Sequence, residues 1–119
     1  MGERPESERP LHETLTDGVE VLRWPHRYAL PEREVLAFFA ARGVSASRWT
    51  NTAGSTYGVH SHHYRKTLFC VGGSITFFLP GSELEVSLAP GDRLILPAGA
   101  PHRAIVGVDG VTCIEAAES

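Results

Sequence analysis

The sequence predicts an all-β domain, a sandwich or barrel of short strands, with one short helix outside it. From Val44 onward, stretches with apolar side chains at strand spacing alternate with turn residues at regular intervals, which is typical of closed β architectures. Residues 31–42 instead carry apolar side chains at helical spacing. Since the chain has 119 residues, we expect one domain with a single core.

The N-terminal part predicts an arm followed by the first strand. The first residues are charged and include two prolines, so we expect a flexible arm over residues 1–16 and the β domain over residues 17–119. Val19–Trp24 predicts a strand that ends at Pro25. Because an unpaired strand edge invites association, this strand also leads us to expect a homodimer.

The helix over residues 31–42 has recognisable ends. Pro31 suits the first helical position. Glu32 and Glu34 place negative charge in the first turn, where it stabilises the helix dipole. Gly43 gives a stop signal directly after the last turn. The apolar face, which we expect to pack against the barrel, consists of Val35, Leu36, Phe38 and Phe39.

The remaining strands follow from alternation and turn residues. Gly72-Gly73 is expected to separate two strands, and Asp109-Gly110 is expected to form the turn of a hairpin. The expected strands cover residues 46–52, 56–62, 67–71, 74–79, 84–88, 93–96, 102–106 and 111–116.

Composition excludes several classes of function. The formal net charge of −3 argues against a general nucleic-acid binder. No apolar run approaches the ~20 residues that a membrane helix needs. The N-terminus shows no hydrophobic signal segment, so we expect a cytoplasmic location. In that compartment, Cys70 and Cys113 are expected to be buried free thiols.

The chemistry of the chain is concentrated around a pair of histidines. His60 and His62 are two positions apart, so on an extended strand both side chains point to the same face. Neutral imidazole is a common protein ligand of zinc, copper, nickel and iron. His63 would then point to the other face. The sequence therefore indicates a metal site that includes His60 and His62.

The surrounding residues resemble the first motif of the cupin family. In that motif a glycine is followed, after five residues of any type, by His-x-His. A glutamate comes three or four residues later, and a second glycine follows after six more residues. Gly54, His60, His62 and Gly73 stand at the matching positions. Lys66 stands where the motif has its glutamate, which is usually a metal ligand.

A later stretch resembles the second cupin motif. That motif is a glycine, five residues, Pro-x-Gly, two residues, a histidine, three residues and an asparagine. Gly91, Pro97, Gly99 and His102 match it, and Val106 replaces the asparagine. The match of both spacings is far more specific than one His-x-His pair.

The resemblance implies a double-stranded β-helix barrel of jelly-roll type. It also implies one divalent transition metal (Fe, Zn, Ni, Mn or Cu) bound by His60, His62 and His102. Three neutral histidines leave coordination positions open for water or substrate, as catalytic sites do. The alternative is a metal-free cupin in which these histidines are hydrogen-bonded pocket residues.

Lys66 is the candidate catalytic residue, and three interpretations of it stay open. Its ammonium could extend to the barrel mouth, orient an acidic substrate, or repel the metal. No Asp or Glu occurs between Val35 and Ser82, so nothing nearby in sequence offsets its charge, and we expect a small anionic ligand. Acids such as Glu83 and Asp92 occur only beyond this stretch, so the sequence argues against a site of two histidines and one carboxylate.

Two classes of function are compatible with this sequence. The first is a metal-dependent enzyme, similar to cupin dioxygenases or isomerases, that acts on a small anionic organic molecule. The second is a module that binds or senses a small molecule without turnover. Fold alone does not distinguish between them.

Overall fold

The computed structural model describes residues 11–15 and 18–118. Most of the predicted arm over residues 1–16 lies outside this part of the chain. The described elements are β1 (His12–Thr14), β2 (Glu20–Leu22), α1 (Glu32–Ala41), β3 (Ser47–Asn51), β4 (Thr56–His60), β5 (Arg65–Leu79), β6 (Leu84–Leu88), β7 (Arg93–Leu96) and β8 (His102–Glu118).

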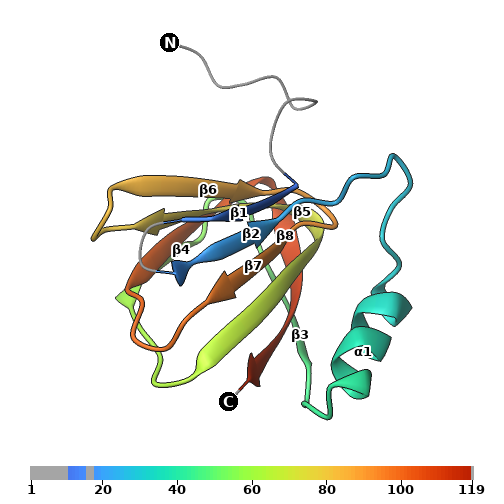
Figure 1. The fold of residues 1–119 in the computed structure, drawn as a ribbon. Coiled ribbons are helices and arrows are strands. Elements are labelled where there is room, and N and C mark those ends of the chain that lie inside the picture. Colours follow the sequence, from blue (N-terminus) through green and yellow to red (C-terminus); the bar gives the residue numbers. More distant parts are fainter. Residues whose placement is uncertain (1–10, 16–17, 119) are drawn as a thin grey trace.

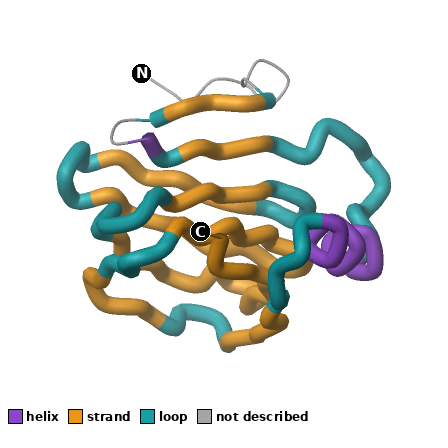
Figure 2. Tube along the Cα trace, turned by 60° about the horizontal axis from the view of Figure 1, so that its bottom comes forward, coloured by secondary structure: helices purple, strands orange, loops and turns teal. Residues whose placement is uncertain are grey.

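The strands form one antiparallel sheet that folds over on itself. Its path runs β1-β2-β7-β5-β8-β3, while β4 pairs with β8 and β6 pairs with β5. The long strands β5 and β8 pair with each other from Arg65–Glu118 to Phe78–Arg103. Each bends and joins both layers of the sheet (Figure 1). The fold is therefore the predicted double-stranded β-helix of jelly-roll type, with α1 outside it (Figure 2).

Two glycine positions explain why β5 and β8 are each one strand, where the sequence predicted two. The register between them shifts on both sides of Gly72-Gly73. Gly73 and Gly110 have φ of 67° and 76°, and a Cβ on Gly73 would lie 1.9 Å from the Gly110 carbonyl oxygen. The predicted hairpin at Asp109-Gly110 is wrong, because these glycines allow two bent strands to approach closely at a bulge.

Two apolar clusters lie on opposite faces of β5 and β8. The barrel interior includes Leu68, Cys70 and Cys113, whereas Phe69 and Ile114 pack on the outer face against α1. Successive residues of these strands are thus buried on both sides. The helix contributes Val35 and Phe39, with Phe38 partly buried beside them. This confirms most of the predicted apolar face, but Leu36 is exposed and does not pack against the barrel.

The predicted stop at Gly43 matches a Schellman motif. The backbone N–H of Gly43 donates to the Ala40 carbonyl at 3.0 Å, and the N–H of Val44 donates to the Phe39 carbonyl at 3.2 Å. Gly43 has φ of 71°, which is the left-handed conformation that this motif requires.

The first predicted strand corresponds to β2, but β2 is not an edge. It pairs with β1 on one side and β7 on the other. The partner β1 lies inside the segment that the sequence predicted as an arm. Since the backbone of β2 is paired on both sides, a dimer through that strand edge is not available. In the described part of the chain, β1 and β3 end the path of the sheet.

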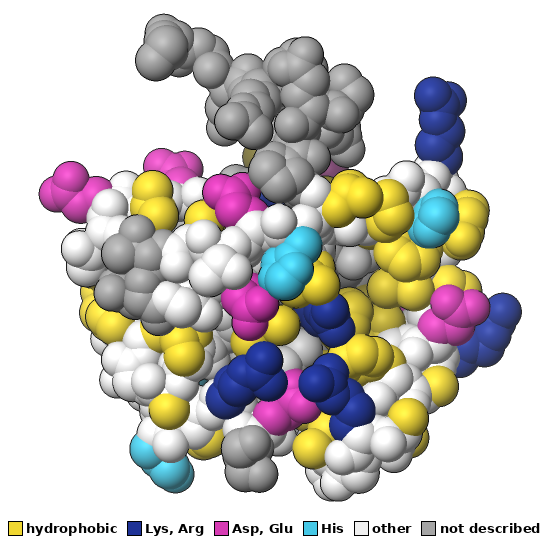
Figure 3. Space-filling view, viewed as in Figure 1, with side chains coloured by type: hydrophobic (Ala, Val, Ile, Leu, Met, Phe, Trp, Pro, Cys, Tyr) yellow, Lys and Arg dark blue, Asp and Glu magenta, His cyan; other side chains and the backbone are white. Residues whose placement is uncertain are grey.

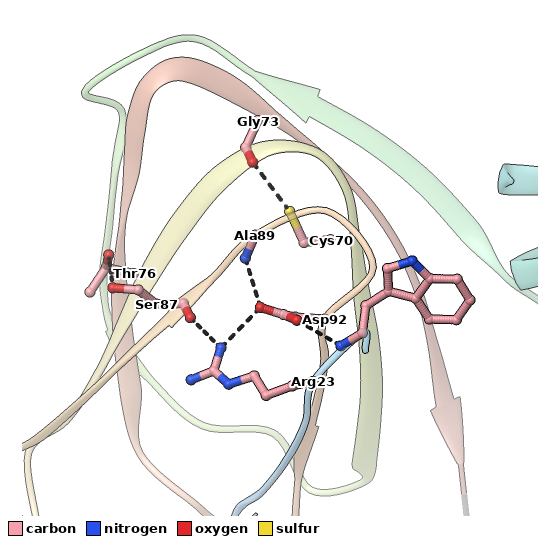
Figure 4. A network of polar contacts seen from close by, with 8 residues as sticks. Arg23, Cys70, Gly73, Thr76, Ser87, Ala89 and Asp92 are labelled. Carbon is pink, nitrogen blue, oxygen red and sulfur yellow. Dashed lines mark hydrogen bonds and ion pairs between the residues drawn. The ribbon is translucent and has the colours of Figure 1, made fainter. Parts of the chain in front are cut away.

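Buried Asp92 connects the chain after β2 to the turn between β6 and β7 (Figure 4). Its carboxylate accepts hydrogen bonds at 3.0 Å from the Arg23 guanidinium and from the backbone N–H groups of Trp24 and Ala89. The Asp92 carboxylate therefore has a structural role, and Asp92 is not part of the histidine group.

The outer surface carries a mixed network of charges. Arg65 lies between Glu20 and Glu118, at 3.9 and 3.7 Å, and Arg42 pairs with Glu118 at 3.1 Å. Basic and acidic side chains are interspersed on the face seen in Figure 3. Among residues 11–15 and 18–118, no helix is long and apolar enough to span a membrane.

Candidate metal centre

Three histidines from separate parts of the fold meet at one end of the barrel interior. His60 ends β4 and pairs in register with His102, which begins β8. His62 follows in the segment between β4 and β5. One ring nitrogen from each residue can be chosen so that the three nitrogens lie within 4.8 Å of one another. The structure thus brings together the three predicted ligands.

Two of these imidazoles are oriented by backbone carbonyls. Nδ1 of His60 lies 2.7 Å from the Gly58 carbonyl oxygen, and Nδ1 of His102 lies 3.0 Å from the Ala100 carbonyl oxygen. Because a carbonyl only accepts, each Nδ1 must carry the proton. The lone pair on each Nε2 is then free to bind a metal, an arrangement typical of histidine ligands.

His62 supplies a different indication. Its Nε2 is buried and has no hydrogen-bond partner among the described residues. A buried polar atom without a partner is costly unless something outside the protein chain satisfies it. A metal ion beside the nitrogens of His60 and His102 would do so, and the donor set of three imidazoles suits zinc, iron, nickel or copper.

The environment favours the neutral, metal-binding form of two histidines. Burial lowers the pKa of His102, although its hydrogen bond to the Ala100 carbonyl partly offsets this effect. Burial is also the largest cause of the lowered pKa of His62, followed by the nearby Lys66 ammonium. Both imidazoles are therefore neutral at neutral pH without a metal to displace their protons.

Two of the three histidines, His60 and His102, open onto a cavity of about 380 Å³ inside the barrel. This volume lies within the range of small-molecule sites. His60, His102 and Lys66 line one part of it. The remaining lining is aromatic, apolar or polar and consists of Trp49, Thr50, Tyr57, Leu68, Ile75, Phe77, Leu96, Ala104 and Glu115.

Lys66 faces this cavity, but its charge is not unpaired as the sequence suggested. Its Nζ lies 2.8 Å from Oε2 of Glu115, on β8. Oε1 of the same carboxylate accepts a hydrogen bond from the Trp49 indole at 2.5 Å. Glu115 lies opposite Leu68 in the register of β5 and β8, so it is a diagonal neighbour of Lys66 on the inner face. Sequence reasoning missed Glu115.

The other histidines and both cysteines lie apart from this group. His12 pairs with Glu20 at 2.8 Å, His26 stacks on Tyr28, and His63 is exposed. Cys70 and Cys113 are free and buried, as predicted, and they lie directly opposite each other on β5 and β8. Their mutual hydrogen bond and burial raise the pKa of the Cys113 thiol, so it remains protonated at neutral pH.

Comparisons with known proteins agree with this architecture. RmlC from Streptococcus suis, solved with dTDP-D-xylose, matches 91% of this chain and 69% of its own, with a TM-score of 0.65 and 14% identity. A cupin-2 domain protein from Shewanella frigidimarina matches 61% of this chain and 68% of its own, with a TM-score of 0.53 and 11% identity.

The DMSP lyase DddQ from Ruegeria pomeroyi is also similar, with a TM-score of 0.59 and 24% identity. The match covers 64% of this chain but only 38% of the lyase. No family model and no curated protein match the sequence. The chain therefore has the cupin fold, with a three-histidine group that fits a metal centre.

Proposed function

We propose that His60, His62 and His102 bind one divalent transition metal, and that the adjoining cavity holds a small anionic organic molecule. The observation that carries this proposal is the unsatisfied, buried Nε2 of His62 beside two imidazoles whose Nδ1 atoms are engaged by carbonyls. Fe, Zn, Ni, Mn and Cu are the candidate ions. When bound, the metal supplies a Lewis-acid or redox centre with coordination positions left for a ligand.

We further propose that the protein is a metal-dependent enzyme, of dioxygenase or isomerase type, and that Lys66 contacts the ligand. Lys66 supports this role because its ammonium lines the same cavity as His60 and His102. The apolar lining would hold the carbon skeleton of a ligand and exclude water from it. The substrates of RmlC and of the DMSP lyase are not transferred to this chain, because at these identities the similarity concerns the fold.

The alternative is a binding or sensing module without turnover. It is favoured by the closed Lys66–Glu115 pair, which leaves Lys66 with a partner even when no ligand is bound. Metal analysis of untagged protein, purified without chelators, separates these functions. One equivalent of iron would support an oxygenase, and zinc or nickel would keep isomerase and binding roles open. Absence of any transition metal would overturn the metal proposal and favour the sensing module.

A further inference from the structure

The cavity contains a fixed pair of opposite charges that the metal centre does not use. Glu115 and Lys66 meet at 2.8 Å, with side chains 20% and 12% exposed. The Trp49 indole N–H holds the other carboxylate oxygen at 2.5 Å. Of the described residues that line the cavity, Glu115 is the one carboxylate and Lys66 the one ammonium.

Stability does not account for this pair. Its neighbours on the inner face, Leu68 and Cys113, are buried and apolar. Placing an ion pair in such surroundings gains little net stability, because the loss of hydration offsets the attraction between the charges. In proteins, replacing a buried ion pair by well-packed apolar side chains of similar size often causes no loss of stability. A functional use of the two charges is the better explanation.

The geometry leaves Glu115 able to act on a ligand. A carboxylate has about four lone-pair positions, and Trp49 and Lys66 occupy two of them. The indole fixes the orientation of the carboxylate, so little reorganisation is needed when a ligand enters. The Lys66 ammonium is in contact with the same carboxylate. Its positive charge would stabilise negative charge on an atom of a ligand that lies beside Glu115.

We propose that Glu115 is the proton-accepting residue of this cavity, and that its substrates are small carboxylic acids with a carbonyl group beside an acidic C–H bond. This inference rests on the proposed function, which supplies the metal that helps to hold the ligand. The C–H bond breaks, its proton moves to a Glu115 oxygen, and its electron pair forms the C=C bond of an enolate. The Lys66 ammonium faces the oxygen that becomes negative. Return of the proton to carbon closes the cycle without an oxidant or reductant.

The direct test is hydrogen exchange at carbon. Pyruvate and 2-oxobutyrate are incubated in D₂O with the metal-bound protein, and loss of the C3 proton signal is followed by NMR. Wild type should exchange these protons faster than free metal at the same concentration. Glu115→Gln should lower the rate by about 100-fold or more, since a positioned base contributes roughly 10²–10⁴-fold. Glu115→Asp, which keeps the carboxylate, should retain part of the rate.

A second measurement uses the metal-free protein and does not depend on turnover. Pyruvate binding is followed by Trp49 fluorescence in a Trp24→Phe background. Glu115→Gln should bind pyruvate several-fold tighter, because Lys66 loses its anionic partner, although the same substitution abolishes exchange. A purely structural Glu115 would instead weaken binding and exchange together, which would overturn the inference.

Controls separate this inference from the proposed function. Glu32 also pairs with a basic residue, Arg48 at 2.6 Å, but on the surface, so Glu32→Gln should leave exchange and metal content unchanged. Wild type that holds metal and shows no exchange above free metal would overturn the role of Glu115 and leave the metal centre intact. Wild type without metal would overturn the proposed function and this inference with it.

Discussion

His60 and His102 lie directly opposite each other where β4 meets β8, with ring centroids 4.2 Å apart. This cross-strand pair explains why two histidines 42 positions apart in sequence act as one unit. Each imidazole is held by the carbonyl two residues earlier, that of Gly58 within β4 and that of Ala100 just before β8. His62 then needs only to reach the same point from the segment after β4. The orientation of His60 and His102 is therefore set by backbone pairing and by these two carbonyls.

The first prediction concerns His62. Replacing it by alanine removes one of three nitrogen ligands and the buried Nε2 that lacks a partner. We expect metal affinity to fall by about 100-fold or more, because loss of a partner that only orients a metal ligand already costs roughly 10–100-fold. Metal content after dialysis measures this. His63→Ala is the matched control, since His63 is exposed and adjacent in sequence. Equal metal content in the His62 and wild-type proteins would contradict the assignment.

The cupin fold and the convergence of His60, His62 and His102 were predicted because the sequence resembles both cupin motifs. Local spacing alone predicted an all-β sandwich or barrel and a shared face for His60 and His62. Glu115 could not be predicted in the same way. On β8, Cys113 faces the barrel interior and Ile114 faces α1, and both are fully buried. When both faces of a strand are buried, hydrophobic alternation disappears. The sequence around Glu115 therefore did not predict whether its side chain points into the barrel or away from it.

The wrong hairpin at Asp109-Gly110 has a related cause. A glycine with positive φ serves a turn and a β-bulge equally well. Only the partner strand distinguishes the two, and here the partner is Gly73, far away in sequence. The pairing of β2 with β1 was missed for a different reason, because the short strand His12–Thr14 lies among charged residues and was predicted as part of the arm.

The second prediction tests the close approach at Gly73. Alanine there would combine a φ of 67° with a Cβ 1.9 Å from the Gly110 carbonyl oxygen. We expect a loss of at least about 2 kcal/mol in the free energy of unfolding, from backbone strain and overlap together. Urea unfolding measures it. Gly58→Ala is the control, because a Cβ on Gly58 meets nothing within 4 Å. Equal stability of the two variants would show that β5 and β8 do not bend here.

The third prediction concerns the Asp92 network in Figure 4. Asp92→Ala leaves the Arg23 guanidinium and the N–H groups of Trp24 and Ala89 without their acceptor. We expect a cost of about 3 kcal/mol in the free energy of unfolding, since partners of a buried charge lose their compensation. Asp109→Ala, at an exposed position, should change this free energy by less than about 0.5 kcal/mol. Metal content should stay the same in both variants.

The fourth prediction is the homodimer. Since β2 is paired on both sides, association through strands would have to use a strand that pairs on one side among the described residues, and β1 and β3, the ends of the path, are two of these. Light scattering at micromolar concentration should give about twice the chain mass of 12.9 kDa. A proline at Thr50, in the middle of β3, would block pairing through that edge, whereas Glu13→Pro would block β1. A mass of 12.9 kDa for the wild type would refute the dimer.

The last prediction concerns Lys66, whose position carries a glutamate in the cupin motif. Lys66→Glu places a second carboxylate beside Glu115, and a bound metal would offset their repulsion. We expect metal to bind more tightly by on the order of tenfold, or about 1.4 kcal/mol, and acetate to bind more weakly. Lys66→Met should leave metal affinity within about threefold but weaken acetate, because it removes the ammonium that lines the cavity.

Arg65→Met is the matched control for Lys66→Met. Arg65 is the preceding residue, so its side chain projects from the opposite face of β5, where it lies near Glu20 and Glu118. Calorimetric titration of the metal-bound proteins with acetate should therefore separate the two methionine variants. If acetate binds equally well to wild type and to Lys66→Met, the ammonium stays with Glu115 and does not contact the ligand. If Arg65→Met weakens acetate as much as Lys66→Met does, the effect comes from net charge and not from a contact in the cavity.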